Sequence, residues 1–249
     1  MNANTNSANT AVGSKAGWKL TGEGNTFIGK DAAENATSCD YSVVIGNQAN
    51  GTGVMTGNYN ILIGSSTGAG MTSGTQNVAV GGGALGTTSS QSYNTAIGYR
   101  AGSSNTGGSN TLVGKDAGHG SLTGDSNTYL GTEAGMGTTS GYGNVAVGKD
   151  TGRGITSGFW NTYLGSNCAT TGNSSYNVGI GNQVLETGAH GSGTVAIGWS
   201  AGEDLTGSSN TLVGAEAGRQ TTSSDNCVAV GWGAMGTAVT TGNENVAVG

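Results

Sequence analysis

The sequence predicts an all-β fold, a β-solenoid of about fifteen short coils, and three observations lead to this prediction. A Gly that ends a motif resembling Asn-Thr-x-Val-Gly recurs at intervals of 16, 17 or 18 residues. The residues before this Gly are rich in β-branched types and alternate with a period of two, as in a short strand. The chain also has 51 Gly and no Pro among its 249 residues, a composition typical of repeat proteins. A fixed period of this size indicates stacked coils.

The recurring Gly marks fifteen copies of the motif, and the intervals between the copies leave no space for a separate domain. We therefore predict a single β-solenoid repeat domain over residues 1–249. The fifteen residues are Gly13, Gly29, Gly46, Gly64, Gly81, Gly98, Gly114, Gly131, Gly148, Gly165, Gly181, Gly198, Gly214, Gly231 and Gly249.

The residues just before each of these Gly residues predict one strand per coil. The residue directly before the Gly is aliphatic in all fifteen copies, and the residue two positions earlier is always Thr, Val or Ile. Because side chains alternate between the two faces of a strand, we expect these two positions to share one face. Their β-branched, apolar character leads us to assign that face to the core.

Two further positions complete the predicted coil. Ala recurs three residues after the Gly, as in Ala32 and Ala101, and predicts an opposite wall that leaves space for only a thin core. Asn precedes the strand in twelve of the fifteen copies and predicts a ladder of side-chain hydrogen bonds between coils. The Thr-, Ser- and Gly-rich remainder, where the coil length varies, is expected to form the outer turn.

The middle residue of each strand is expected to point away from that core, although it is never charged. A solvated face should carry polar residues, so this stripe predicts a face covered by self-association along the solenoid. The residues predicted to line the interface are Ala11, Phe27, Val44, Leu62, Ala79, Ala96, Leu112, Tyr129, Ala146, Tyr163, Ala196, Leu212, Ala229 and Ala247.

The repeat also resembles known families. The strings Asn144-Val145-Ala146-Val147-Gly148 and, over residues 94–102, NTAIGYRAG resemble the head repeat of trimeric autotransporter adhesins and the slightly longer repeats of phage tail-fibre proteins. The resemblance covers essentially the whole chain, and the coil length matches the phage repeats better. It implies a left-handed parallel β-roll in a side-by-side homotrimer, and a location in a virion tail fibre or on a cell surface.

Residues with catalytic or metal-binding potential are sparse. The two histidines, His119 and His190, lie several coils apart, and the three cysteines show no metal-ligand spacing. The cysteines are expected to be free thiols, and the pairs Lys30-Asp31, Lys115-Asp116 and Lys149-Asp150 to be solvated ion pairs. We expect no enzyme activity, no cofactor and no metal.

Charge and hydropathy limit the possible partners. The net charge is −6, and no run of Lys or Arg could follow a phosphate backbone. No apolar stretch has the length of a membrane-spanning helix, and the first residues lack the pattern of a secretory signal. We therefore expect neither nucleic-acid binding nor membrane insertion by this segment.

Aromatic side chains form two columns that could bind a cell-surface glycan or another host receptor, because their rings can stack on sugar rings. Stacking between coils, which would stiffen the turns, is the alternative explanation. The first column lies five residues before the Gly and the second directly after it. The residues are Tyr41, Tyr59, Tyr93, Trp160 and Tyr176 in the first column, and Tyr99, Trp199 and Trp232 in the second.

Three functions are compatible with these features. The first is a structural or receptor-binding segment of a trimeric fibre, in which a phage tail fibre is preferred to a bacterial adhesin. The second is an ice-binding solenoid, which the sequence disfavours because the registered Thr residues are predicted to point inward. The third is a polysaccharide depolymerase, for which no suitable pair of acidic residues recurs.

Overall fold

The structure is a computed structural model that describes residues 8–87, 90–236 and 241–249. It divides into two compact units, residues 1–126 and 127–249, which are described one at a time. The described residues form β-strands and turns and contain no helix. The all-β class and the β-solenoid are therefore confirmed, while the prediction of a single domain stays a prediction.

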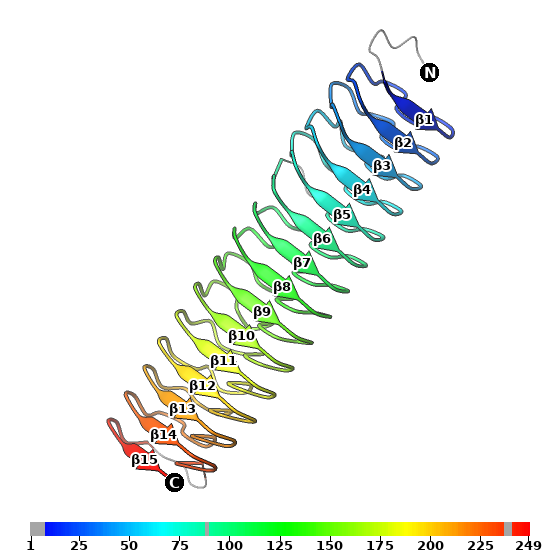
Figure 1. Cartoon of the computed structure of the whole chain (residues 1–249). Helices are drawn as coiled ribbons and strands as arrows, with labels where there is room; N and C mark the ends of the chain where they lie inside the picture. Colours follow the sequence, from blue (N-terminus) through cyan, green and yellow to red (C-terminus); the bar gives the residue numbers. More distant parts are fainter. Residues whose placement is uncertain (1–7, 88–89, 237–240) are drawn as a thin grey trace. The chain divides into compact units, whose positions relative to one another are not determined.

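The described residues of unit 1 form seven strands of three residues each, one strand per coil (Figure 1). Neighbouring strands pair in parallel, so that Thr10 lies beside Thr26 and Thr95 beside Thr111. The strands are β1 (Thr10–Val12), β2 (Thr26–Ile28), β3 (Val43–Ile45), β4 (Ile61–Ile63), β5 (Val78–Val80), β6 (Thr95–Ile97) and β7 (Thr111–Val113).

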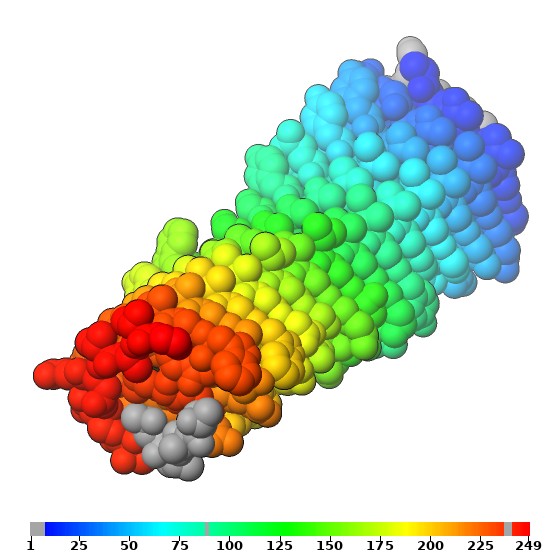
Figure 2. Space-filling model, turned by 60° about the horizontal axis from the view of Figure 1, so that its bottom comes forward, coloured from blue at the N-terminus to red at the C-terminus, as the bar shows by residue number. Residues whose placement is uncertain are grey.

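Unit 2 repeats this arrangement with eight strands, again parallel and with equivalent residues side by side. Figure 2 shows side chains of successive coils aligned in rows on the surface of each unit. The strands are β8 (Thr128–Leu130), β9 (Val145–Val147), β10 (Thr162–Leu164), β11 (Val178–Ile180), β12 (Val195–Ile197), β13 (Thr211–Val213), β14 (Val228–Val230) and β15 (Val246–Val248).

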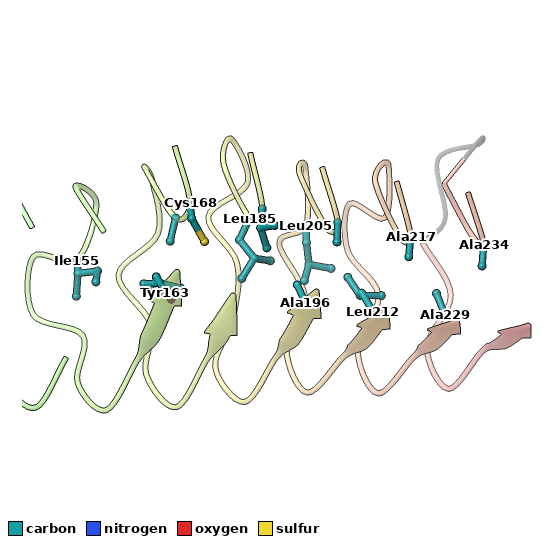
Figure 3. Close-up of a cluster of buried hydrophobic side chains, with 13 residues drawn as sticks. Ile155, Tyr163, Cys168, Leu185, Ala196, Leu205, Leu212, Ala217, Ala229 and Ala234 are labelled. Atoms are coloured by element: carbon teal, nitrogen blue, oxygen red, sulfur yellow. The ribbon is translucent and has the colours of Figure 1, made fainter. Parts of the chain in front are cut away.

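The core of each coil lies between the middle residue of the strand and the Ala wall on the opposite side. In unit 2, Tyr163, Ala196 and Leu212 point across the coil toward the wall that holds Cys168, Leu185 and Ala217 (Figure 3). The residues that follow the motif Gly by three positions are buried throughout, as predicted: Ala16, Ala32, Ala49, Ala84, Ala101, Ala117, Ala134, Ala201, Ala217 and Ala234.

Core volume is balanced within single coils. Tyr129 has a large buried ring, and its coil places Gly135 opposite, where an added Cβ would lie 2.3 Å from a ring atom. Ala146 has a small side chain, and Ile155 fills the space in that coil. Packing to the density of a protein interior therefore requires size changes on one wall to match those on the other.

The predicted Asn ladder is present and fixes the start of each strand. Asn144 Oδ1 accepts hydrogen bonds from the backbone N–H of Asn161 (3.0 Å) and from Asn161 Nδ2 (3.0 Å), while Asn144 Nδ2 donates to Gly158 O (2.8 Å). Ser42, which replaces Asn in one coil, accepts from the amide of Asn60 through Oγ (3.1 Å). These bonds satisfy buried polar groups that would otherwise destabilise the thin core.

Candidate functional site

The outer face of the strands carries aliphatic residues that are exposed or half-buried. It consists of two rows, one of Thr, Val or Ile at the first strand position and one of Val, Ile or Leu at the third. Ile97 is 40% exposed and Leu164 is 46% exposed, whereas the residues between the two rows are buried. We call these two rows the strand face.

The structure corrects the predicted trimer interface. Of the side chains assigned to that interface, those of Phe27, Val44, Leu62, Ala79, Ala96, Leu112, Tyr129, Ala146, Tyr163, Ala196, Leu212 and Ala229 are buried in the core of their own unit, and those of Ala11 and Ala247 are half-buried. They cannot line a contact between chains while they fill the core. The physical reason is volume, because the opposite wall of Ala and Gly leaves too little space for two rows of β-branched side chains.

This correction also changes the direction of the Thr residues. Thr26, Thr95 and Thr111 belong to the strand face and point out of the coil, whereas the sequence analysis placed them inside. Parallel pairing keeps equivalent positions directly side by side, so the Thr and aliphatic residues form straight rows within each unit. These Thr residues are exposed or half-buried. The prediction that they point into the core, which disfavoured ice binding, is therefore wrong.

The first aromatic column is exposed, as a binding role requires. Tyr41, Tyr59, Tyr93, Trp160 and Tyr176 all have more than a third of their surface exposed, and each has a positive φ between 52° and 65°. Other coils place Gly at this position, as in Gly24, Gly143 and Gly193, or a residue of type Ala, Ser, Gln, Asn or Glu. The left-handed conformation is unfavourable for a bulky residue, so the backbone conformation does not explain why these side chains are aromatic.

In unit 1, part of this column stacks between neighbouring coils. The rings of Tyr41 and Tyr59 lie 5.4 Å apart and are nearly parallel. Tyr41 Oη also donates to Glu23 Oε1 (2.8 Å), and this hydrogen bond raises the pKa of Tyr41. For these two residues the structure supports the stiffening role that the sequence left open.

In unit 2, the column belongs to a larger group that sequence reasoning missed. Tyr142 and Phe159 lie one position before the column, and their rings stack at 5.0 Å. Tyr142 also makes an edge contact with Trp160, and Phe159 makes one with Tyr176. We call these four residues the aromatic cluster. The sequence signal was the adjacent pair Phe159-Trp160, but a search confined to a single column does not include Phe159.

The second aromatic column has smaller, separate environments. The guanidinium of Arg100 lies 5.8 Å from the centre of the Tyr99 ring, and Trp199 Nε1 donates to Gln183 Oε1 (3.2 Å). Trp232 is 73% exposed. No aromatic ring contact among the described residues joins any two of these three side chains, so they do not form one site.

The titratable groups of the described residues do not converge on a reactive centre. No group of three or more His, Cys, Asp or Glu residues in these ranges could hold a metal ion, and these ranges enclose no pocket. Cys39, Cys168 and Cys227 are buried free thiols, as predicted, and burial raises the pKa of Cys39 and of Cys168 to about 12. Buried thiols of this kind are poor nucleophiles.

Charged side chains form local ion pairs beside the ends of the strands. The predicted pairs are present at 3.7 Å for Lys30–Asp31, 3.0 Å for Lys115–Asp116 and 3.2 Å for Lys149–Asp150. The lysines are well exposed, so each pair contributes little to stability. No helix within the described ranges meets the length and hydropathy needed to cross a membrane.

No protein-family model matches this chain, and no curated protein matches it significantly. The arguments about function therefore rest on the strand face and on the aromatic cluster.

Proposed function

We propose that this chain is a non-enzymatic segment of a trimeric fibre that presents or spaces a surface for host recognition. In this proposal, three copies lie side by side as left-handed solenoids and bury their strand faces against one another. A phage tail fibre is the preferred setting, which gives a virion location, and a bacterial surface adhesin comes next. The observation that supports the proposal most directly is the exposed apolar strand face.

The size of this face supports a partner. The eight strands of unit 2 rise by ~4.8 Å per coil and are about 10 Å wide, so their outer face covers roughly 400 Å² in projection. The face of unit 1 has similar dimensions. The largest apolar patch on a typical monomer covers about 300–600 Å² and is often functional, so the strand face of each unit has the size of such a patch.

The pattern of the face supports a second copy of the chain as that partner. The strand face has no charged residue at any of its positions, so it offers no ionic contact to a partner of another kind. It repeats once per coil, and a surface with the same repeat can match it coil by coil. The chain itself has that repeat, which is why we infer self-association.

The test is light scattering of the purified chain, for which we expect a mass three times 24.2 kDa. Ile97→Glu and Leu164→Glu place a charge on the strand face and should shift the mass to that of a monomer while the chain stays folded. Val54→Glu is the matched control, because Val54 lies on an outer turn and is exposed to a similar degree, at 49%. A monomeric wild-type chain at high concentration would contradict the proposal.

A second candidate function is ice binding, and one observation favours it. The Thr residues of the strand face point outward in straight rows beside aliphatic residues, and such a regular flat surface could order a layer of water. The two functions compete for the same face, because a trimer would bury it. Ice shaping by a monomeric chain that is lost in Ile97→Glu would support this candidate, whereas ice growth like that in buffer would exclude it.

A further inference from the structure

The aromatic cluster of unit 2 is a compact surface group drawn from three successive coils. Tyr142 comes from the coil of β9, Phe159 and Trp160 from that of β10, and Tyr176 from that of β11. Trp160 is 57% exposed and Tyr176 is 60% exposed. In Figure 2, yellow-green atoms project from the surface of unit 2, and the bar gives this colour to the part of the chain near β10.

The backbone at this site does not require aromatic side chains at Trp160 and Tyr176. Their φ angles are 58° and 62°, and Gly143 and Gly193 have the same kind of conformation in the neighbouring coils. Other coils place Ala, Ser, Gln, Asn or Glu at this position with a similar φ. The turn therefore accepts many residue types, and its conformation does not explain why two large rings occur here.

The position of the Trp160 ring is well defined. A Cβ added to Gly143 would lie 3.1 Å from Trp160 Cε3, so the indole lies directly against the backbone of the preceding coil. The edge contact with Tyr142 holds the ring from a second direction. A ring that is fixed in this way loses little conformational entropy when a ligand stacks on it.

The turn segments that carry the aromatic cluster are uncharged and rich in hydrogen-bonding groups. Residues 138–144, 155–161 and 171–177 include no Asp, Glu, Lys or Arg. Asn173 Oδ1 accepts from the backbone N–H of Ser157 (2.6 Å) and of Gly158 (2.8 Å), and Asn173 Nδ2 donates to Ser157 Oγ (2.8 Å). Asn173 and Ser157 are exposed. Ser157 lies two residues before Phe159 in the chain, and Asn173 lies three residues before Tyr176, so each turn carries a polar side chain close to its aromatic residue in the sequence.

These features match a neutral saccharide better than other ligands. A pyranose ring has an apolar face of C–H groups that stacks on aromatic rings, and its hydroxyls exchange hydrogen bonds with amides and hydroxyls. A nucleic acid or an acidic glycan needs cationic side chains, which the aromatic cluster lacks. The absence of charged residues from these three turn segments therefore favours an uncharged ligand.

We propose that the aromatic cluster, with Asn173 and Ser157 beside it, binds neutral polysaccharide chains by stacking on their sugar rings. The biological setting rests on the proposed function, since a fibre that recognises a host surface would need such a site. The binding chemistry itself depends on unit 2 only.

The test is the mobility of the full chain in native gels that contain soluble dextran, galactomannan or hydroxyethyl cellulose, with heparin as a charged comparison. We expect at least one neutral polymer to slow the chain. The double variant Trp160→Gly and Tyr176→Gly should weaken that binding by about tenfold or more. This variant should fold, because Gly is the native residue at the same position of neighbouring coils. Trp18→Ser is the control and should bind like the wild type, because Trp18 is 51% exposed but belongs to neither aromatic column.

The outcomes separate this proposal from the fibre proposal. If no neutral polymer slows the wild-type chain, if only heparin does, or if the double variant binds as tightly, the saccharide site is wrong. Light scattering of the same samples reports the oligomer separately. Binding by a monomeric chain would leave the saccharide site supported while the trimer fails, and a trimer that binds no polymer would give the reverse result.

Discussion

At the scale of single residues, the Gly at the end of each strand occupies a backbone position that other residues cannot take. Gly81 has a φ of +131°, and a Cβ at this position would lie 2.4 Å from Gly98 O in the next coil. The neighbouring Gly82 has no such restriction, because its added Cβ would meet Tyr99 Cδ2 at 3.6 Å, an ordinary contact. Two adjacent Gly residues therefore have different structural roles.

We predict that Gly81→Ala lowers the free energy of unfolding by about 3 kcal/mol or more, because both the φ angle and the contact between coils must change. Gly82→Ala is the matched control and should change it by less than about 1 kcal/mol in either direction. Urea denaturation followed by circular dichroism measures both values. Equal effects of the two substitutions would contradict the contact that the structure gives Gly81.

A second residue-scale feature is the buried pair Tyr163 and His190. His190 Nε2 lies 2.9 Å from Tyr163 Oη, and His190 Nδ1 lies 3.4 Å from Gly188 O. With the proton on Nδ1, the neutral ring donates to Gly188 O and accepts from the tyrosine hydroxyl. Burial lowers the pKa of His190 from 6.5 to about 4, because the charged ring would lose its hydration.

This lowered pKa predicts a loss of stability in acid. The unfolded chain binds the proton near pH 6.5 and the folded chain only near pH 4, so the contribution of His190 is complete above about pH 6.5 and falls as the pH drops toward 4. The full loss is about 3 kcal/mol. His190→Gln keeps a hydrogen-bonding group but does not titrate, so urea denaturation at several pH values should give a flatter profile. A profile as steep as that of the wild type would assign the effect to other groups.

At the scale of the strand, the middle residue is buried in the core, whereas the residues directly before and after it lie on the outer strand face. Ala146 is fully buried, while Val145 is 37% exposed on the strand face. We predict that Ala146→Glu destabilises unit 2 by more than about 3 kcal/mol, because the carboxylate would have no partner in the core. Val145→Glu should cost less than about 1 kcal/mol of folding free energy under conditions where the chain is monomeric.

The measurement is denaturation of both variants by urea, with circular dichroism as the signal. The reverse order of stability would restore the strand orientation predicted from the sequence. The comparison is informative because both substitutions introduce the same side chain into the same strand, β9.

The strand also shows what could be predicted from the sequence and what could not. The period and the strand positions followed from residues that repeat in every coil, and the Ala wall and the Asn ladder followed from residues that repeat in most coils. The choice of face did not, because a strand of three residues such as Val145-Ala146-Val147 is apolar on both sides and the alternation fits either orientation. A signal was present in the pairing of sizes across one coil: the large Tyr129 occurs with Gly135, which indicates that these two residues meet in the core.

At the scale of the whole molecule, repetition predicts architecture but not ligands. The two aromatic columns were visible because they follow the period, and they include Trp160 and Tyr176. Tyr142 and Phe159 both lie six residues before the motif Gly, one position ahead of the first column, and the structure shows that their rings stack. Residues shared by all coils predict the architecture, whereas a binding site formed by residues of only a few coils does not stand out from the repeat.

The chemistry of the strand face gives the whole molecule a distinctive response to salt. If apolar contacts hold the copies together, raising the NaCl concentration to ~1 M, where charges are screened beyond ~3 Å, should not dissociate the trimer. Cooling should weaken the association, because hydrophobic stabilisation decreases at low temperature. Sedimentation velocity at several salt concentrations and temperatures measures both responses.

Ile97→Lys is the comparison, since repulsion between its charges should make any remaining association stronger as salt increases. Dissociation of the wild-type trimer by salt would instead place the contact on ion pairs such as Lys30–Asp31, beside the strand ends, and would remove the strand face from the interface.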